Sequence, residues 1–350
     1  MRVLFLTLYP DTAASTRYRV SQFLPYLRAN GVECTIDAPL SNEQFTTLTG
    51  PGRKGRPLWY HLAETPRRIV QLLGAHKFDI VVVQKAIMSA YLRGMGALLR
   101  NRAKRIVYDL DDAVHLTPPH PLRSIWKTLE DPNQSRKLFR MADLVLAGNT
   151  WLAEAAQTNG APRAEVLPTV VDTDRFAPAA TASETYRIGW IGNPSTTPAL
   201  EVAREALAGI DQAEVCLVGA DADHACLETA EVKPWTLETE VAEIQRFSVG
   251  IMPLAKTEWT RGKCALKALQ YMACRVPCIA TPYGAVRDII RHEENGLFAD
   301  TPEEWRAALD SLRDPDLRKK LGAAGRATVE QHFSLDAAAP RMLSLLESVQ

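Results

Sequence analysis

Residues 250–281 read GIMPLAKTEWTRGKCALKALQYMACRVPCIAT, and this stretch decides the fold class. Its two ends, 250–254 and 278–281, are short apolar runs with the length of buried strands. Between them, residues 264–274 repeat apolar side chains at the spacing of a helix that packs one face on a core. A strand, a helix and a second strand in this order form the crossover of a parallel sheet. The stretch therefore predicts an α/β protein.

The same alternation of apolar runs and amphipathic stretches fills residues 1–170, as in a doubly wound, Rossmann-like sheet. We predict strands there at Val3–Leu8, Cys34–Ala38, Ile80–Gln84, Ile106–Asp109, Leu144–Ala147 and Ala164–Leu167. We predict helices at Ser15–Ala29, Trp59–Leu73, Met88–Asn101, Leu122–Met141 and Trp151–Asn159.

The second half repeats the pattern around the opening stretch. Further strands are predicted at Arg187–Ile191 and Val215–Val218, and further helices at Glu201–Leu207, Glu240–Phe247 and Val286–His292. From Pro302 onward the pattern is wholly helical, with breaks near Asp314–Pro315 and Phe333–Ser334.

Residues 171–184 break both periodicities and are predicted to be a hinge. They separate an N-terminal domain, 1–170, from a C-terminal domain, 185–334, and the last helix, 335–350, is expected to pack back toward the first domain. The predicted fold is thus two Rossmann-like domains whose parallel sheets face a central cleft. Ligands of such sheets bind at the carboxyl ends of the strands.

Composition points to an ordinary globular protein, with 46% apolar and 23% charged residues. No apolar run reaches the ~20 residues of a membrane span, and the start of the chain is typical of a first strand, not of an export signal. The six cysteines are scattered, as in a reduced protein. These features predict a cytoplasmic location.

Charge is distributed unevenly between the two halves. Residues 1–170 hold 22 Lys and Arg against 14 Asp and Glu, whereas residues 171–350 hold 19 against 27. A basic first half indicates an anionic partner, or else solvated helix faces that are basic by chance. Basic and aromatic residues share the segment 53–68 (Arg53, Lys54, Arg56, Trp59, Tyr60, Arg67 and Arg68). This pattern favours peripheral contact with the anionic inner face of a membrane, and a plain surface is the alternative.

Three cations gather where the helix of the opening stretch begins: Arg261, Lys263 and Lys267. A helix N-terminus attracts anions through its unpaired N–H groups. Added cations suit a diphosphate, because a nucleoside diphosphate that leaves a sugar gains charge that must be neutralised. The alternative is a basic turn that faces solvent.

Three carboxylates, Asp109, Asp111 and Asp112, end a predicted strand. Because like charges this close repel each other, the cluster needs a use such as hydroxyl binding, cation binding or helix capping. A metal-binding Asp-x-Asp motif, in a fold with a single Rossmann-like domain, is the competing interpretation. Against it stand the second Rossmann-like half and the cationic helix.

Five segments in order resemble the retaining family-4 glycosyltransferases, which have the GT-B fold. They are STRYRV at 15–20, YDLDDAV at 108–114, PTVVDTDRF at 168–176, IGWIGNPST at 188–196, and RGKCALKALQYMA at 261–273. The last is similar to one branch of that family. The resemblance implies transfer of a sugar from a UDP-, GDP- or ADP-sugar with retention of anomeric configuration, and no metal or other cofactor.

The resemblance also implies roles for residues of the second half. Gln270 stands where the family carries the second of two glutamates and is expected to bind the donor ribose, while Gly262 stands at the first. Asn193 and Thr197 lie where many members carry an Arg and a Lys for the diphosphate, so Arg261, Lys263 and Lys267 are expected to supply that charge. Asn193, Tyr283 and Gly284 are expected near the donor sugar.

In the first half, Ser15 or Thr16 is expected to cap the helix. Arg17 or Arg19 would then reach a phosphate, and Arg17 is preferred because it lies nearer the helix start. Asp111 or Asp112 takes the place of a family histidine beside the reacting sugar, and His115 follows within one turn.

The acceptor is expected to be a glycan, a lipid-linked sugar or a small molecule, and no nucleic-acid partner is expected. Two other activities stay open. The departure at Gly262 is consistent with a non-catalytic binder of nucleotide sugars or glycans. A sugar-nucleotide epimerase of the same fold is the third interpretation.

Overall fold

The computed structural model describes the chain except for residues 50–57, 118–123, 181–184, 225–226 and 228. The described chain divides into two compact units: unit 1 is Met1–Thr169 with Ala338–Gln350, and unit 2 is Val170–Ala337. Residues described at the start of the predicted hinge thus group with unit 2. The end of the last helix groups with unit 1, where Arg163 donates a 2.8 Å hydrogen bond to the Ser348 hydroxyl.

Unit 1 is built on a six-stranded parallel sheet in the order β2-β1-β3-β4-β5-β6. The strands are β1 Arg2–Leu6, β2 Glu33–Asp37, β3 Ile80–Gln84, β4 Ile106–Leu110, β5 Leu144–Ala147 and β6 Ala164–Val166. The order reverses between β1 and β3, so this is the switch point of the sheet, where open α/β sheets bind ligands. All six strands were predicted from their apolar runs, to within two residues at each end.

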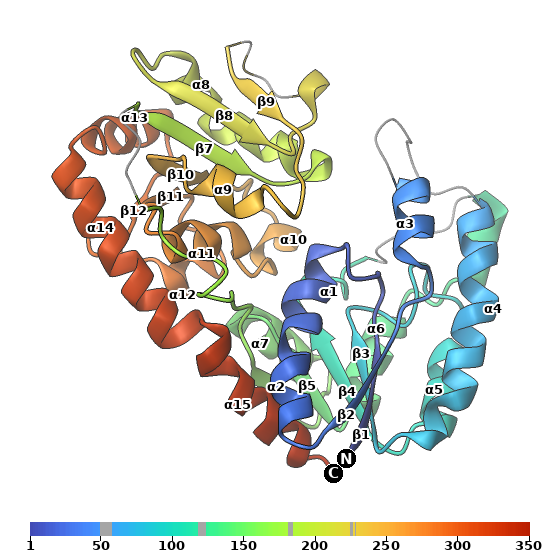
Figure 1. Cartoon of the computed structure of the whole chain (residues 1–350). Helices are drawn as coiled ribbons and strands as arrows, with labels where there is room; N and C mark the ends of the chain where they lie inside the picture. Colours follow the sequence, from blue (N-terminus) through green and yellow to red (C-terminus); the bar gives the residue numbers. More distant parts are fainter. Residues whose placement is uncertain (50–57, 118–123, 181–184, 225–226, 228) are drawn as a thin grey trace. The chain divides into compact units, whose positions relative to one another are not determined.

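The helices of unit 1 lie on both faces of this sheet; Figure 1 shows α1 and α2 on one side and α4 and α5, which pack side by side, on the other. They are α1 Ala14–Arg19, α2 Leu24–Ala29, α3 Asn42–Thr49, α4 Leu58–Gly74, α5 Met95–Arg102, α6 Gln134–Met141 and α7 Thr150–Thr158. Short 3₁₀ turns occupy Ser21–Phe23, Ala75–Lys77 and Ser124–Leu129.

Three predicted helices of unit 1 are shorter or broken. In place of the predicted helix at 122–141, the described residues form a 3₁₀ turn at Ser124–Leu129 and α6, which begins only at Gln134. The predicted helix at 15–29 is interrupted at Val20, and α2 carries Pro25 in its first turn, where the missing N–H is tolerated. The predicted helix at 88–101 begins only at Met95, after Gly94 adopts the left-handed conformation (φ +85°).

Unit 2 has a second six-stranded parallel sheet, in the order β12-β11-β10-β7-β8-β9. The strands are β7 Arg187–Ile191, β8 Glu214–Val218, β9 Glu231–Lys233, β10 Val249–Met252, β11 Cys278–Ala280 and β12 Leu297–Phe298. This is the dinucleotide-fold order, and its switch point lies between β7 and β10. β9 and β12 were not predicted, because runs of two or three residues show no periodicity.

The helices of unit 2 are mostly short. They are α8 Arg204–Ala208, α9 Glu240–Ile244, α10 Glu258–Arg261, α11 Leu266–Ala273, α12 Val286–Ile289, α13 Pro302–Ser311 and α14 Pro315–Thr328, with 3₁₀ turns at Pro194–Ala203 and Ala222–His224. A π-helical turn, Val329–Phe333, leads into α15 Leu335–Glu347. The predicted breaks between the terminal helices are therefore present.

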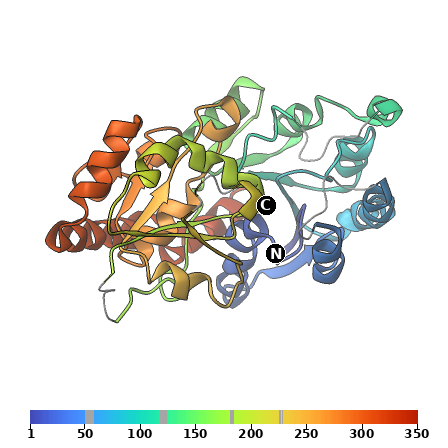
Figure 2. The ribbon, with the colours of Figure 1, turned by 90° about the horizontal axis from the view of Figure 1, so that it is seen from above.

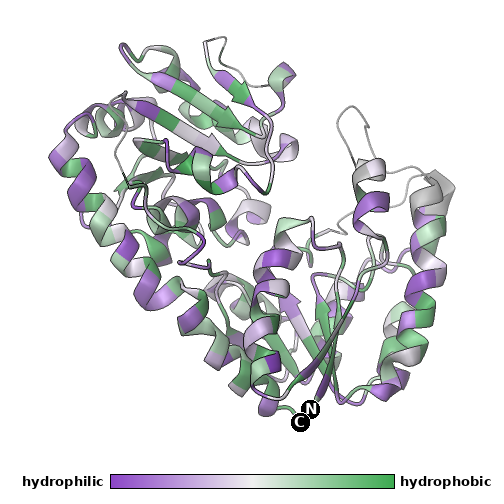
Figure 3. Cartoon of the chain, in the orientation of Figure 1, coloured by the Kyte–Doolittle hydropathy of each residue, from purple (hydrophilic) through white to green (hydrophobic). Residues whose placement is uncertain are grey.

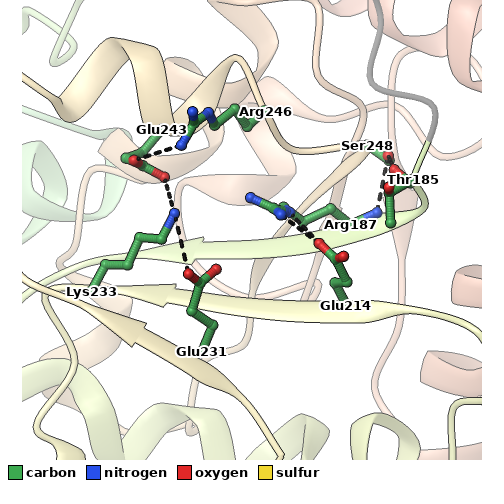
Figure 4. Close-up of polar contacts among 8 residues, drawn as sticks. All are labelled: Thr185, Arg187, Glu214, Glu231, Lys233, Glu243, Arg246 and Ser248. Carbon is green, nitrogen blue, oxygen red and sulfur yellow. Dashed lines mark hydrogen bonds and ion pairs between the residues drawn. The ribbon is translucent and has the colours of Figure 1, made fainter.

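Apolar strands form the centre of each unit, and Figure 3 colours them green against mixed helices. At the edge of the unit 2 sheet, charged side chains are paired instead. Lys233 of β9 contacts Glu243 of α9 at 3.1 Å and Glu231 at 3.5 Å, and Glu243 also binds Arg246 at 3.3 Å (Figure 4). These contacts fasten α9 to the edge strand.

Two properties of the whole chain bear on its setting. Five of the six cysteines, all but Cys226, are described and carry free thiols. Among the described helices, none combines the length and the hydropathy that crossing a bilayer would require.

Candidate functional site

A tyrosine side chain lies between the two strands at the switch point of unit 2. β7 and β10 pair only through Val249 with Ile188 and Gly250 with Gly189. Beyond these pairs the Tyr271 hydroxyl accepts a hydrogen bond from the Ile191 N–H at 3.0 Å and donates to the Ile251 carbonyl at 3.3 Å. A buried side chain of α11 thus satisfies backbone groups of two diverging strands.

Glycines let the ring and the neighbouring loops approach this point. A Cβ at Gly250 would lie 2.4 Å from the Tyr271 ring. After β8, Gly219 has φ +75°, and a Cβ there would lie 2.4 Å from the carbonyl oxygen of Gly192, which follows β7. The loops after β7 and β8 are therefore in backbone contact at the carboxyl ends of their strands.

The cationic segment follows β10, but it is not one helix. α10 ends at Arg261 and α11 begins at Leu266, after Ala265 adopts a left-handed conformation (φ 54°). Lys263 and Lys267 therefore do not lie on one helix, because Lys263 lies in the turn between α10 and α11.

The three cations differ in exposure and surroundings. Arg261 is exposed, while Lys263 and Lys267 are half-buried. The Lys267 ammonium lies 5.2 Å from the ring centroid of Trp190, a buried residue of β7, in a cation–π contact. Trp190 in turn lies beneath Gly192, where a Cβ would be 2.2 Å from its ring. This contact places Lys267 at the switch point.

The loop after β11 lies against α10. The Tyr283 hydroxyl donates to the Thr257 carbonyl at 3.2 Å. Gly284 has φ +61°, and a Cβ there would be 2.9 Å from the Arg261 carbonyl oxygen. Tyr283, Gly284 and Arg261, predicted separately, are thus brought together.

Gln270 lies one turn after Lys267 and is buried, with 4% of its surface exposed. Its amide nitrogen donates to Glu240 Oε1 at 3.1 Å. The sequence reasoning assigned Glu240 no role. The only sequence feature that marked Glu240 was its position as the first residue of the predicted helix Glu240–Phe247.

The positions matching the family's phosphate-binding Arg and Lys have local roles. Asn193 is exposed, and its side chain accepts a 2.6 Å hydrogen bond from the Ser195 hydroxyl. Thr197 is fully buried and its hydroxyl accepts from the Asp221 N–H at 2.9 Å. Neither side chain carries a charge, whereas residues 261–267 include three cations.

In unit 1, Arg19 and Asp109 form a buried ion pair, with 2% and 1% of their surfaces exposed. Both guanidinium edges are used: Nε lies 3.1 Å from Asp109 Oδ2, Nη2 contacts Oδ1, and Nη1 donates to the Leu167 carbonyl at 2.7 Å. Arg19 and Asp109 were predicted to contact the ligand. Their mutual pairing gives them a structural role, in which α1 is fixed to β4 and to the end of β6.

Lys85, which the sequence reasoning missed, stands directly after β3 at the switch point of unit 1. It is buried, has a left-handed backbone (φ 70°), and its ammonium contacts Asp112 and lies 3.6 Å from Asp111. Burial opposes its charging, but attraction by Asp111 and Asp112 outweighs burial and raises the pKa of Lys85. The sequence feature that could have identified Lys85 is its position at the end of one predicted strand, while the next predicted strand ends in the carboxylates Asp109, Asp111 and Asp112.

Burial has the larger effect on Asp111. It raises the pKa of this carboxyl although Lys85 attracts its charged form. The metal interpretation of the cluster is disfavoured because Lys85 occupies the space beside Asp111 and Asp112, and Arg19 engages Asp109. Within the part of the chain that the structure describes, no three His, Cys, Asp or Glu residues are arranged to hold a metal ion.

The remaining predicted residues of unit 1 lie around α1 and after β4. α1 begins after Ala13, whose side chain cannot cap it; the Thr16 hydroxyl bonds back to the Tyr9 carbonyl at 2.8 Å. Arg17 is half-buried and donates to the Thr12 carbonyl at 2.7 Å. His115 is buried between the rings of Trp151 and Phe139, at centroid distances of 5.4 and 5.9 Å.

The two sheets and their switch points define a GT-B glycosyltransferase fold, and comparisons with known proteins agree. Residues 18–175 match the model "Glycosyltransferase Family 4", and residues 185–314 match "Glycosyl transferases group 1". Because the two matches together span most of the chain, it belongs to the group 1/family 4 glycosyltransferases.

One curated relative is N-acetyl-alpha-D-glucosaminyl L-malate synthase of Bacillus anthracis, 30% identical over 99 residues. The match covers 27% of this chain and about a quarter of that protein. Among solved structures, sucrose-phosphate synthase of Thermosynechococcus elongatus superposes with a TM-score of 0.74 at 15% identity, over 99% of both chains. Anabaena HepE in complex with UDP gives 0.71 at 15% identity, over 99% of this chain and 100% of the other.

Proposed function

We propose that the protein transfers a sugar from a nucleoside-diphosphate sugar to an acceptor hydroxyl, with retention of anomeric configuration. The observation that carries this proposal is the switch point of unit 2. There Lys267 is fixed on Trp190 beside the loop at Gly192, while Gly284 packs on the Arg261 backbone. Cations beside glycine loops at the ends of parallel strands suit a diphosphate.

The donor's parts are assigned to unit 2. Arg261, Gly262, Lys263 and Lys267 contact the diphosphate, and the three cations neutralise it. Gln270 binds the ribose hydroxyls. Asn193, Tyr283 and Gly284 lie near the sugar.

The acceptor side is assigned to unit 1. Asp111 and Asp112, held by Lys85, accept hydrogen bonds from a sugar or acceptor hydroxyl, with His115 one turn away. Arg17 reaches a phosphate of donor or acceptor. The acceptor classes are a glycan, a lipid-linked sugar or a small molecule.

The chemistry proposed is substitution on one face of the sugar. The acceptor oxygen bonds to the anomeric carbon on the face from which the phosphate leaves. The leaving phosphate takes the proton of the acceptor hydroxyl while its own bond to that carbon breaks. The protein's part is to orient both substrates and to stabilise the charge that grows on the diphosphate. No metal or other cofactor is assigned a step.

A binding and turnover panel tests the proposal. UDP-, GDP- and ADP-sugars are screened by thermal shift, since a ligand that binds only the folded chain raises its melting temperature. UDP-glucose is tried first, because HepE was solved with it. Active donors are then assayed for release of nucleoside diphosphate, with and without acceptor sugars.

The panel also separates the alternatives. A non-catalytic binder gives a thermal shift without nucleotide release. An epimerase changes the donor sugar without an acceptor and without nucleotide release. No thermal shift with any nucleotide sugar would contradict the proposed function.

A second proposal is peripheral contact of α4 with an anionic membrane. Leu62, Val70 and Leu73 recur along this helix and are 64%, 68% and 40% exposed, with the exposed Arg67 among them. Apolar residues with a neighbouring cation suit an interface of anionic lipid.

Of the other predicted residues, Arg68 is buried and donates to the Thr7 carbonyl, so it is no part of this face. Arg53, Lys54 and Arg56 and the side chains of Trp59 and Tyr60 lie outside the described residues.

Sedimentation with liposomes tests this contact. The chain should sediment with vesicles containing anionic lipid and lose most of that binding when Leu62 and Val70 are both changed to Ser. Equal sedimentation with neutral and anionic vesicles would count against it.

A further inference from the structure

Glu240 is a buried carboxylate surrounded by hydrogen-bond donors at the candidate donor site. It begins α9 and is 3% exposed. Its Oε1 accepts from Gln270 at 3.1 Å and from the Trp235 indole N–H at 3.3 Å, and its Oε2 accepts from Arg175 at 2.8 Å. Indole and guanidinium groups donate and cannot accept, so this environment requires an acceptor at position 240.

The carboxylate determines how the Gln270 amide is turned. An ionised carboxylate has no hydrogen to donate, so the amide must present its NH₂ end to Glu240. The carbonyl oxygen Oε1 of Gln270 is thereby directed away from Glu240. A reversed amide would bring its oxygen against a carboxylate oxygen, and both would repel.

Contacts outside the site hold Glu240 in place. Glu243, one turn further along α9, is tied to Lys233 of β9 and to Arg246 (Figure 4). Arg175 reaches Glu240 from the segment before β7 and also donates to the Leu237 carbonyl at 3.1 Å. The orientation of Gln270 therefore rests on contacts among residues of unit 2.

We propose that Glu240 is the positioning residue of the ribose subsite. The contact joins a carboxylate on α9 to an amide on α11. Glu240 fixes the amide so that Gln270 presents Oε1 as an acceptor to a ribose hydroxyl. This inference rests on the proposed function, because it takes the ligand to be a ribonucleotide.

The test compares ribonucleotides with analogues that lack the ribose hydroxyls. UDP, GDP and ADP, and their 2′,3′-dideoxy forms, are titrated into the full chain by calorimetry. The wild type should prefer the ribonucleotide that it binds by about 10-fold or more, as expected for a hydrogen bond lost from a buried site. Glu240→Gln should remove most of this preference, because a glutamine at 240 allows either orientation of the Gln270 amide.

An exchange of the two side chains makes the test sharper. Gln270→Glu alone places a second carboxylate about as close to Glu240 as the amide is now. Because two like charges this close repel each other, one of the two must hold a proton. Ribonucleotide binding should therefore weaken as pH rises. The double variant Glu240→Gln/Gln270→Glu restores one donor and one acceptor, and should return the ribose preference to within about threefold of wild type.

A matched control separates positioning from folding. Glu238→Gln removes a charge at an exposed position two residues before Glu240, and should leave the ribose preference unchanged. Inorganic pyrophosphate should bind the wild type and Glu240→Gln alike. A Glu240→Gln variant that retains the wild-type preference overturns the inference while the proposed function stands. A wild type that binds none of the three nucleotides overturns the proposed function, and the inference with it.

Discussion

The two sheets reverse their strand order at different strands, and the residues at the two switch points differ in charge and burial. At the switch point of unit 1, charge is buried and met by the chain itself: Lys85 faces Asp111 and Asp112. At the switch point of unit 2, the strand ends are met by glycine loops and the neutral hydroxyl of Tyr271. The cations of unit 2 lie in α10, in the turn after it and in α11, and they are more exposed than Lys85.

The difference shows two ways to form a site at the switch point of a parallel sheet. Fixed ion pairs in unit 1 hold carboxylate oxygens in place, which suits the recognition of neutral hydroxyl groups. Closely packed backbone in unit 2 leaves room for a bulky anion, and half-buried cations such as Lys267 supply its counter-charge. Each variant below tests one side of this contrast.

The largest effect on stability is expected from the buried pair of unit 1. Arg19→Met leaves Asp109 charged and buried without its partner, which should lower the free energy of unfolding by about 3–5 kcal/mol. Urea denaturation measures this loss. Arg17→Met is the control, since Arg17 is half-buried, and should change stability by less than about 1 kcal/mol. Equal effects of the two variants would contradict a structural role for Arg19.

The next effect is on turnover and belongs to unit 2. Lys263→Ala should reduce kcat by about 10²-fold, because one donor to the developing charge is worth ~3 kcal/mol. Its melting temperature should stay near wild type, since Lys263 lies in a turn and is half-buried. Lys320→Ala, an exposed lysine of α14, is the control. Wild-type turnover in Lys263→Ala would remove the diphosphate assignment.

The sequence was sufficient for most strands, and most plainly for β1, β3, β5 and β8, each of which carries a continuous apolar run of four residues. It was not sufficient for the site. The contact of Lys267 with Trp190 joins residues 77 positions apart, and that of Glu240 with Gln270 joins two helices. Local spacing contains no information about such pairs. The turn at Ala265 was missed because alanine favours helix, and only tertiary packing imposes its left-handed backbone.

The Tyr271 hydroxyl provides a third test, of intermediate size. Tyr271→Phe keeps the ring on Gly250 but leaves the Ile191 N–H and the Ile251 carbonyl without this partner. Buried groups left this way should cost about 1–3 kcal/mol of stability. Nucleotide affinity should fall with it, because α11 carries Lys267 and Gln270. Amide hydrogen exchange at Ile191, faster in the variant, would locate the effect, and unchanged exchange would show that the hydroxyl does not hold the switch point.

The smallest effect on stability is expected at Asp111, where the substitution should raise the free energy of unfolding instead of lowering it. Burial raises the pKa of this carboxyl, so its charged form is disfavoured in the folded chain. A raised carboxyl pKa means that the folded state takes up its proton at a higher pH than the unfolded state, and this carboxyl destabilises the fold above that range. Asp111→Asn should therefore be more stable than wild type at neutral pH, by an amount on the order of 1 kcal/mol. The gain should shrink as pH falls and Asp111 in the wild type becomes protonated.

If Asp111 binds a substrate hydroxyl, the same variant should lose turnover while it gains stability, whereas Asp310→Asn on the surface of α13 should change neither. Urea denaturation at neutral and acidic pH, with turnover measured beside it, checks both halves. A variant less stable than wild type at neutral pH would show that the ion pair with Lys85 outweighs the burial of Asp111.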